Sequence, residues 1–141
     1  MTDDQATLSV TVPREWQRVV ATDGWRPPGV DATFPALSVA TGRDWADRGS
    51  TAQGVFLGVL PGDELPERLP QHPECGQAGG RITDSGRLGP SATVVHSDCP
   101  TGYVVERVVQ VTDDQLLWVQ VRSADRGHAN RVLDGVDVHG M

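Results

Sequence analysis

Alternating apolar and polar side chains predict β-strands along most of the chain. Residues 8–12 read Leu-Ser-Val-Thr-Val, the two-residue period of a strand with one buried face. Residues 54–60 carry no polar side chain and therefore predict a central strand. Further strands are predicted at 36–40, 92–96, 103–111 and 115–122. Because residues 112–114 supply a turn between the last two, this pair predicts a β-hairpin.

Apolar residues three and four positions apart predict a helix near the C-terminus. Ser123 is suited to the N-cap, Asp125 places negative charge in the first turn, and Gly135 can end the helix. Its apolar stripe would consist of Ala129, Val132, Leu133 and Val136. Residues 136–138 could add a short closing strand. Shorter helical segments are predicted at 14–21, 43–48 and 64–69.

Residues 61–90 lose both periodicities and are dense in proline and glycine, which predicts a long irregular loop. The order of elements predicts an α+β fold, a mostly antiparallel sheet with helices packed on its faces. The length of 141 residues fits one domain, which we place at 8–140. Residues 1–7 are polar and acidic, and we expect them to be disordered.

Composition narrows the function classes. The net charge of −7 argues against a nucleic-acid partner, because phosphate binding needs clustered cations. All 12 basic residues are arginine, which is typical of a GC-rich genome such as that of an actinobacterium. No apolar run approaches the roughly 20 residues that span a bilayer, and the acidic start is not a signal peptide. The chain is therefore either cytoplasmic or a domain of a longer exported or membrane-anchored protein.

The two cysteines, Cys75 and Cys99, favour a disulfide that tethers the segment 61–99. Such a bond would close a loop of about 25 residues and stabilise the fold by roughly 3 kcal/mol. A second interpretation notes that His72 and His96 each precede a cysteine by three residues. These four residues provide two nitrogen and two sulfur ligands, a set that suits tetrahedral zinc. Free buried thiols are the third alternative.

Catalytic signals are missing from the sequence. There is no Gly-x-Ser-x-Gly elbow, no phosphate-binding glycine loop and no kinase motif. We therefore expect no catalytic residue, no cofactor and no enzyme activity.

Four tryptophans carry the binding hypothesis. Trp16 and Trp45 lie on predicted helices and are expected in the core. Trp25 lies beside a proline-rich turn, where partial exposure is plausible. Trp118 shares a strand face with Gln120 and Arg122. The candidate ligand-binding residues are Trp25, Trp118, Gln120 and Arg122, and structural packing is the alternative role for both tryptophans.

Several segments together resemble a known family. These segments are 10–16 (Val-Thr-Val-Pro-Arg-Glu-Trp), 72–75, 98–99, 117–122 and 130–134. They are similar to PsbP-like α/β/α sandwich domains, and in particular to the extracellular C-terminal domain of actinobacterial receptor-type serine/threonine protein kinases and related surface lipoproteins. The resemblance implies that fold and an extracellular location. It carries over no catalytic residue, because the kinase chemistry of such proteins lies in another domain.

These observations lead to three functional hypotheses. The first is a non-catalytic extracytoplasmic sensor or ligand-binding domain of a membrane-anchored protein, whose partner would be a small molecule, a cell-wall component or a protein. This segment itself would not insert into the membrane. The second is a cytoplasmic partner-binding adaptor of the same fold with reduced cysteines. The third is a small zinc-binding module.

Overall fold

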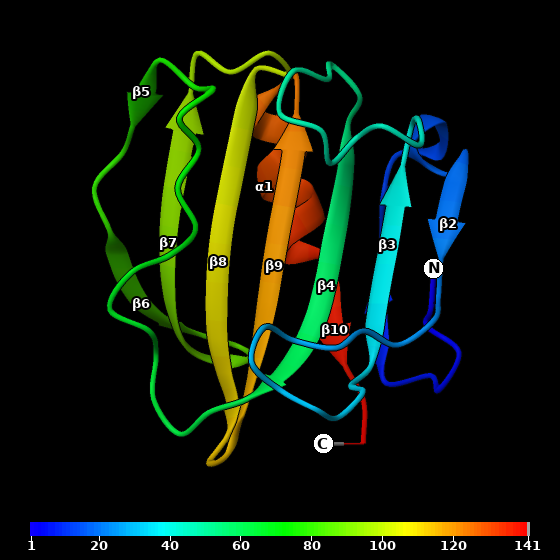
Figure 1. Ribbon diagram of the computed structural model, residues 1–141, viewed down its shortest axis with the longest axis vertical. Helices are drawn as coiled ribbons and strands as arrows, with labels where there is room; N and C mark the ends of the chain where they lie inside the picture. The colour runs from blue at the N-terminus through cyan, green and yellow to red at the C-terminus, as the bar shows by residue number, and fades with distance from the viewer. Residues whose placement is uncertain (141) are drawn as a thin grey trace.

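The computed structural model describes residues 1–140, and a large antiparallel sheet dominates it (Figure 1). The strand order is β2-β3-β4-β9-β8-β7-β5, and β6 also pairs with β7. The strands are β2 (Val19–Ala21), β3 (Ala36–Ala40), β4 (Gly54–Pro61), β5 (Gln77–Ala78), β6 (Ile82–Gly86), β7 (Gly89–Ser97), β8 (Tyr103–Thr112) and β9 (Gln115–Ser123). The long valine-rich strands β8 and β9 lie at its centre, where β-branched side chains pack well.

The hairpin expected near the C-terminus is confirmed. Tyr103 pairs with Ser123 at its open end and Thr112 pairs with Gln115 at the turn, with a bulge between Gln110 and Thr112. The central position predicted for residues 54–60 is also confirmed, since β4 lies between β3 and β9.

One face of the sheet is covered by α1 (Arg126–Asp134), by the 3-10 turn η1 (Arg14–Trp16), and by a two-stranded sheet of β1 (Leu8–Val10) and β10 (Val136–Val138). In Figure 1, α1 lies behind β8 and β9. Trp16 and Leu117 are fully buried in this layer. Alternate residues of β4, β8 and β9 supply the rest of the core, among them Val55, Leu57, Val105 and Val119.

The C-terminal helix agrees with its prediction in position and in its buried residues Ala129, Val132 and Leu133. Its N-cap is Asp125 rather than Ser123, because the Asp125 carboxylate accepts the backbone N–H of His128 at 3.0 Å. Gly135 is the C-cap, and Val136 begins β10 instead of extending the helix.

The predicted α+β fold with helices on the faces of the sheet, an α/β/α sandwich, is wrong. Within residues 1–140, α1 is the one α-helix, and it covers a single face. The protein is β-rich, and irregular segments cover the second face.

Local chemistry explains the helices that did not form. Residues 14–21 make only η1 before Val19 and Val20 enter strand β2, where these β-branched residues pair with β3. Residues 43–48 form turns and bends. In residues 64–69, Pro66 cannot donate a helical hydrogen bond, and Pro70 follows directly.

Two expected irregular segments are more ordered than predicted. Residues 1–7, which were expected to be disordered, make defined contacts: the Asp3 carboxylate accepts the backbone N–H groups of Thr7 at 2.7 Å and Leu8 at 2.8 Å. Within the predicted irregular loop 61–90, the longest stretch without a strand is residues 62–76, and β5 and β6 follow it before β7 begins at Gly89. We call residues 62–76 the strap.

Candidate functional site

The second face of the sheet carries the candidate site. The strap crosses this face in front of the sheet in Figure 1. Two strap residues, Leu65 and Leu69, hold it there by packing on a small apolar cluster of the sheet that includes Ala92, Val108 and Leu116. The strap is therefore anchored by apolar contacts at its start and by a covalent bond at its end, as described below.

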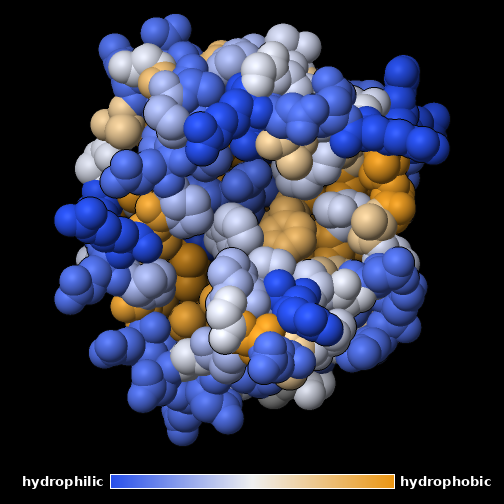
Figure 2. Space-filling model, in the orientation of Figure 1, coloured by the Kyte–Doolittle hydropathy of each residue, from blue (hydrophilic) through white to orange (hydrophobic). Residues whose placement is uncertain are grey.

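Three aromatic rings, which we call the aromatic cluster, lie beside the strap. Ring centroids are 5.0 Å apart for Trp25 and Phe56, 5.2 Å for Phe56 and Trp118, and 5.6 Å for Trp25 and Trp118. All three side chains remain half-buried. Figure 2 shows apolar surface in the middle of this face, surrounded by hydrophilic side chains. The cluster is thus an apolar patch that no element of the chain fully covers.

Gly58 on β4 makes room for the cluster. A Cβ atom at this position would lie 2.6 Å from the Trp25 ring, which is closer than any real contact. Trp25 lies against this glycine and donates its Nε1–H to the Val59 carbonyl at 2.8 Å. The turn-rich segment that carries Trp25 is thereby fixed to the sheet.

A buried carboxylate lies next to the aromatic cluster. Glu106 on β8 is 0% exposed, so its charge has lost all contact with water. Its oxygens accept hydrogen bonds from the Trp118 indole N–H at 3.2 Å and the Gln120 amide at 2.9 Å. These donors offset part of the cost of burying a charge.

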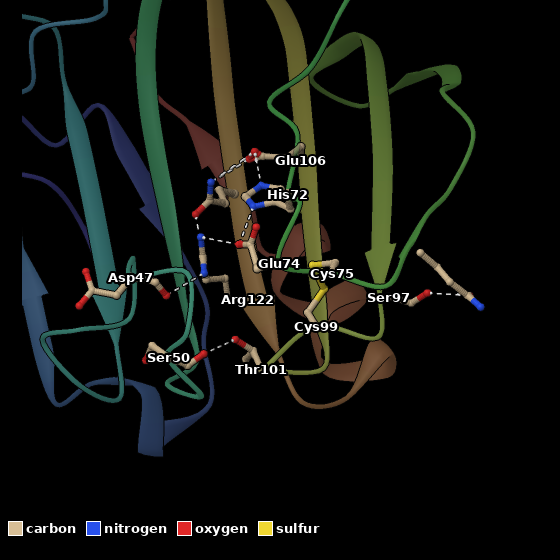
Figure 3. The surroundings of a disulfide bond; sticks show 12 residues. Asp47, Ser50, His72, Glu74, Cys75, Ser97, Cys99, Thr101, Glu106 and Arg122 are labelled. Carbon is tan, nitrogen blue, oxygen red and sulfur yellow. Dashed lines mark hydrogen bonds and ion pairs between the residues drawn. A yellow bond between two sulfur atoms is a disulfide. The ribbon is translucent and has the colours of Figure 1, made fainter.

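Arg122 on β9 continues this arrangement (Figure 3). It is 4% exposed and donates its Nε–H to the Gln120 side-chain oxygen at 3.2 Å and its Nη1 to the Asp47 carbonyl at 3.4 Å. Its Nη2 lies 3.7 Å from the Glu74 carboxylate of the strap. Gln120 therefore links a buried anion, Glu106, to a buried cation, Arg122.

His72 joins the strap to both carboxylates. Its Nδ1 is 3.1 Å from Glu74 Oε2, and its Nε2 is 3.6 Å from Glu106 Oε2. Burial alone would lower the pKa of His72, but Glu106 and Glu74 outweigh it and raise the pKa above the ordinary 6.5. We call His72, Glu74, Glu106 and Arg122 the charged network. With His72 protonated, its two anions and two cations balance.

The pKa of Glu74 shifts in the opposite direction. Burial would raise it, but a backbone hydrogen bond and the charges of His72 and Arg122 outweigh burial and lower the pKa from 4.5. Both shifts therefore favour the charged forms of His72 and Glu74.

His96 on β7 lies beside the network. It is 4% exposed, and its ring centroid is 4.9 Å from that of His72. The Pro70 backbone is a polar neighbour of the ring, but neither ring nitrogen makes a hydrogen bond of ordinary geometry. Burial, followed by the positive charge of His72, lowers the pKa of His96. Burial and the neighbouring charge thus favour the neutral form of this imidazole.

The predicted disulfide is present. Cys75 at the end of the strap and Cys99 after β7 are joined with an S–S distance of 2.07 Å. The bond uses both sulfur atoms, so the alternative zinc set of His72, Cys75, His96 and Cys99 is not assembled in this oxidised form. Within residues 1–140, no three His, Cys, Asp or Glu side chains are arranged to hold a metal ion.

A groove of about 550 Å³ opens between the strap and β7. His72, Cys75 and His96 line it together with apolar residues such as Leu69 and Val94. The groove is separate from the aromatic cluster, none of whose members line it.

The fold brings together the four predicted binding residues, Trp25, Trp118, Gln120 and Arg122, on one face. Arg122 is buried in the charged network, whereas the two tryptophans keep exposed surface. Glu106 was not among the site residues predicted from the sequence. A signal was present, because Glu106 alternates with Val104 and Val108 on one face of a central strand, where a carboxylate needs partners.

Comparison with family models, with curated proteins and with solved structures gives no match. The resemblance to PsbP-like domains and to receptor-kinase ectodomains therefore remains a prediction. Across the described residues, no helix has the length and apolar character needed to cross a bilayer.

Proposed function

We propose that this protein is a non-catalytic extracytoplasmic binding or sensor domain whose contact surface is the aromatic cluster. The observation that carries the proposal is the incomplete burial of Trp25, Phe56 and Trp118 on the face that α1 leaves uncovered. Tryptophan and other aromatic side chains are enriched at contact surfaces, because they offer large apolar area at a small entropic cost.

The charged network supports a binding role over a catalytic one. Each of its charges faces an opposite charge within the cluster, and the side chains of Glu106, His72, Glu74 and Arg122 are all at most 8% exposed. Groups that are buried and mutually paired hold a surface in shape, whereas general acids and bases must reach a substrate. The network supports the aromatic cluster from below, since Trp118 donates directly to Glu106.

The disulfide supports an extracytoplasmic location. Structural disulfides persist in oxidising environments and are rare in the cytosol. Together with the sequence resemblance, the bond favours the ectodomain of a receptor-type serine/threonine kinase or a surface lipoprotein over a cytoplasmic adaptor. The ligand class that fits this location is a cell-wall component.

The indole N–H signals of the oxidised, ¹⁵N-labelled protein test the proposal. Soluble muropeptides and cell-wall oligosaccharides serve as probes. We expect the signals of Trp25 and Trp118 to shift with a saturable dependence on one probe. The signal of Trp16, which is buried under the opposite face, should stay unchanged and acts as an internal control.

A variant pair sharpens the test. Trp25→Ala removes one ring and should weaken binding by about tenfold or more, as expected for a central aromatic contact. Val20→Ala, at an exposed apolar residue on strand β2, should leave the affinity unchanged. Binding that ignores Trp25→Ala would contradict the assigned surface, and failure of every probe would contradict a cell-wall ligand.

A further inference from the structure

The fold brings two copies of one short motif together. His72 and Cys75 form a His-x-x-Cys motif in the strap, and His96 and Cys99 form a second one at the end of β7. The cysteines are covalently joined, and the histidine rings contact each other edge to face. His72, Cys75 and His96 line one groove, and the disulfide holds Cys99 against Cys75.

The histidine geometry suits a shared metal ion. Two imidazoles on one tetrahedral zinc, with Zn–N bonds of about 2.0 Å, have ring centroids about 5 Å apart. The centroids of His72 and His96 are 4.9 Å apart. The separation of the two rings is therefore compatible with coordination of one ion by both.

The unpaired nitrogens of His96 are a second, independent observation. Neither ring nitrogen of this buried side chain makes a hydrogen bond of ordinary geometry, and the neighbouring Nε2 of His72 has only the Glu106 carboxylate, at 3.6 Å. Buried imidazole nitrogens normally have partners, and a bound cation is one explanation for their absence. The groove that His72 and His96 line with Cys75 gives a small ion a route to them.

The disulfide explains why the site is closed in the oxidised form. Zinc binds thiolates, and both sulfur atoms are committed to each other. The carboxylates nearby are poor substitutes. Glu106 is held by Trp118 and Gln120, and Glu74 faces Arg122.

We propose that reduction of the Cys75–Cys99 bond creates a zinc site whose ligands are His72, Cys75, His96 and Cys99. A dithiol reductant breaks the S–S bond, each cysteine sulfur gains one proton, and the reductant becomes a cyclic disulfide. Zn²⁺ then forms two Zn–S bonds and two Zn–N bonds; it displaces both thiol protons and, where the His72 imidazole is charged, the extra proton of that ring, and these protons go to the solvent. Oxidised and reduced proteins thus hold the strap by two different cross-links.

The test compares both redox forms of the full chain, purified without a histidine tag. The protein is reduced with dithiothreitol, desalted under anaerobic conditions and titrated with Zn²⁺ alone. We expect one Zn²⁺ per reduced chain, release of about two to three protons per ion near pH 7, and no comparable binding by the oxidised form. Co²⁺ in place of Zn²⁺ should give the thiolate charge-transfer and tetrahedral ligand-field absorption of a two-sulfur site.

Variants separate this site from adventitious thiol binding. His72→Asn and His96→Asn should each weaken zinc binding by at least about 100-fold. His139→Asn, at an exposed histidine near the C-terminus, is the matched control and should leave the affinity unchanged. The double variant Cys75→Ser/Cys99→Ser should not bind.

If reduction unfolds the chain, near-UV circular dichroism can show whether zinc folds it again. Zinc should then restore the tryptophan signal of the folded protein. Zinc binding that tolerates both histidine variants, or that leaves the chain unfolded, would overturn the proposal. The proposed function is tested on the oxidised protein, so either proposal can fail without the other.

Discussion

Glu106 on β8 and Gln120 on β9 face each other as a cross-strand pair, and the Gln120 amide donates to the Glu106 carboxylate at 2.9 Å. Trp118, two residues earlier on the same face, donates to the same carboxylate. One buried anion therefore fixes a ring of the aromatic cluster and organises the charged network beside it.

Removal of this anion should be costly. Glu106→Ala would leave the donors of Trp118 and Gln120 buried without an acceptor, and the charges of His72 and Arg122 without balance. We expect the free energy of unfolding to fall by about 3 kcal/mol or more, measured by urea denaturation. Glu67→Ala, at an exposed strap residue, should change it little. Equal effects of the two variants would contradict the structural role of Glu106.

The two histidines should give the oxidised protein a stability maximum near pH 6.5. The folded-state pKa of His72 is raised, so its contribution is complete below 6.5 and is lost as pH rises through the folded value. The folded-state pKa of His96 is lowered, so its contribution is complete above 6.5 and is lost as pH falls through the folded value.

Thermal unfolding between pH 5 and pH 9 checks this prediction. His72→Gln should reduce the loss of stability on the alkaline side, and His96→Gln should reduce the loss on the acidic side. If a variant shows the same dependence of stability on pH as the wild type, the histidine that it lacks is not coupled to folding.

The disulfide should contribute about 3 kcal/mol to stability, because it closes a segment of 24 residues. Cys75→Ser/Cys99→Ser should lower the free energy of unfolding by about this amount. The strap should also be cleaved faster by trypsin at Arg68, whose side chain is exposed. Wild-type protein with and without reductant provides the comparison. Unchanged cleavage would mean that Leu65 and Leu69 alone hold the strap.

Gly58 should not tolerate a larger residue. In Gly58→Ala the new Cβ meets the Trp25 ring, so the ring must move and the Nε1–H bond to Val59 must lengthen or break. We expect a loss of about 1 to 3 kcal/mol and a red-shifted tryptophan emission. Gly80→Ala, where the added carbon meets nothing within 4 Å, is the control.

The sequence predictions were accurate where interactions are local in sequence and failed where an element depends on pairing with a distant segment. The β8–β9 hairpin and α1 were predictable because alternation, turn residues and an apolar stripe act within a few residues. The segment 14–21 was misjudged because its pattern fits a helix, whereas Val19 and Val20 gain more by pairing with β3. The disulfide was favoured over zinc binding and free thiols because the cysteine count is even, a signal that can be read without knowing the path of the backbone.

Local sequence patterns could not have predicted the charged network. Glu74, Glu106 and Arg122 are distant in sequence, and they meet only because β8 pairs with β9 in one register and the strap folds back across both. Trp118, Gln120 and Arg122 could be grouped from alternation on one strand. The approach of Trp25 to Trp118 depends on an irregular segment whose path no periodicity encodes.

The pairing of β1 with β10 determines how the molecule would respond to tension. Leu8, where β1 begins, pairs with Val138, where β10 ends, so a pull between Thr7 and His139 loads one rung at a time. Strands pulled apart from one end lose their hydrogen bonds one after another, which needs little force. Strands pulled along their length must break all of their hydrogen bonds at once, which needs more. Stretching would therefore peel this small sheet from the core first, while the large sheet and its aromatic face stay intact.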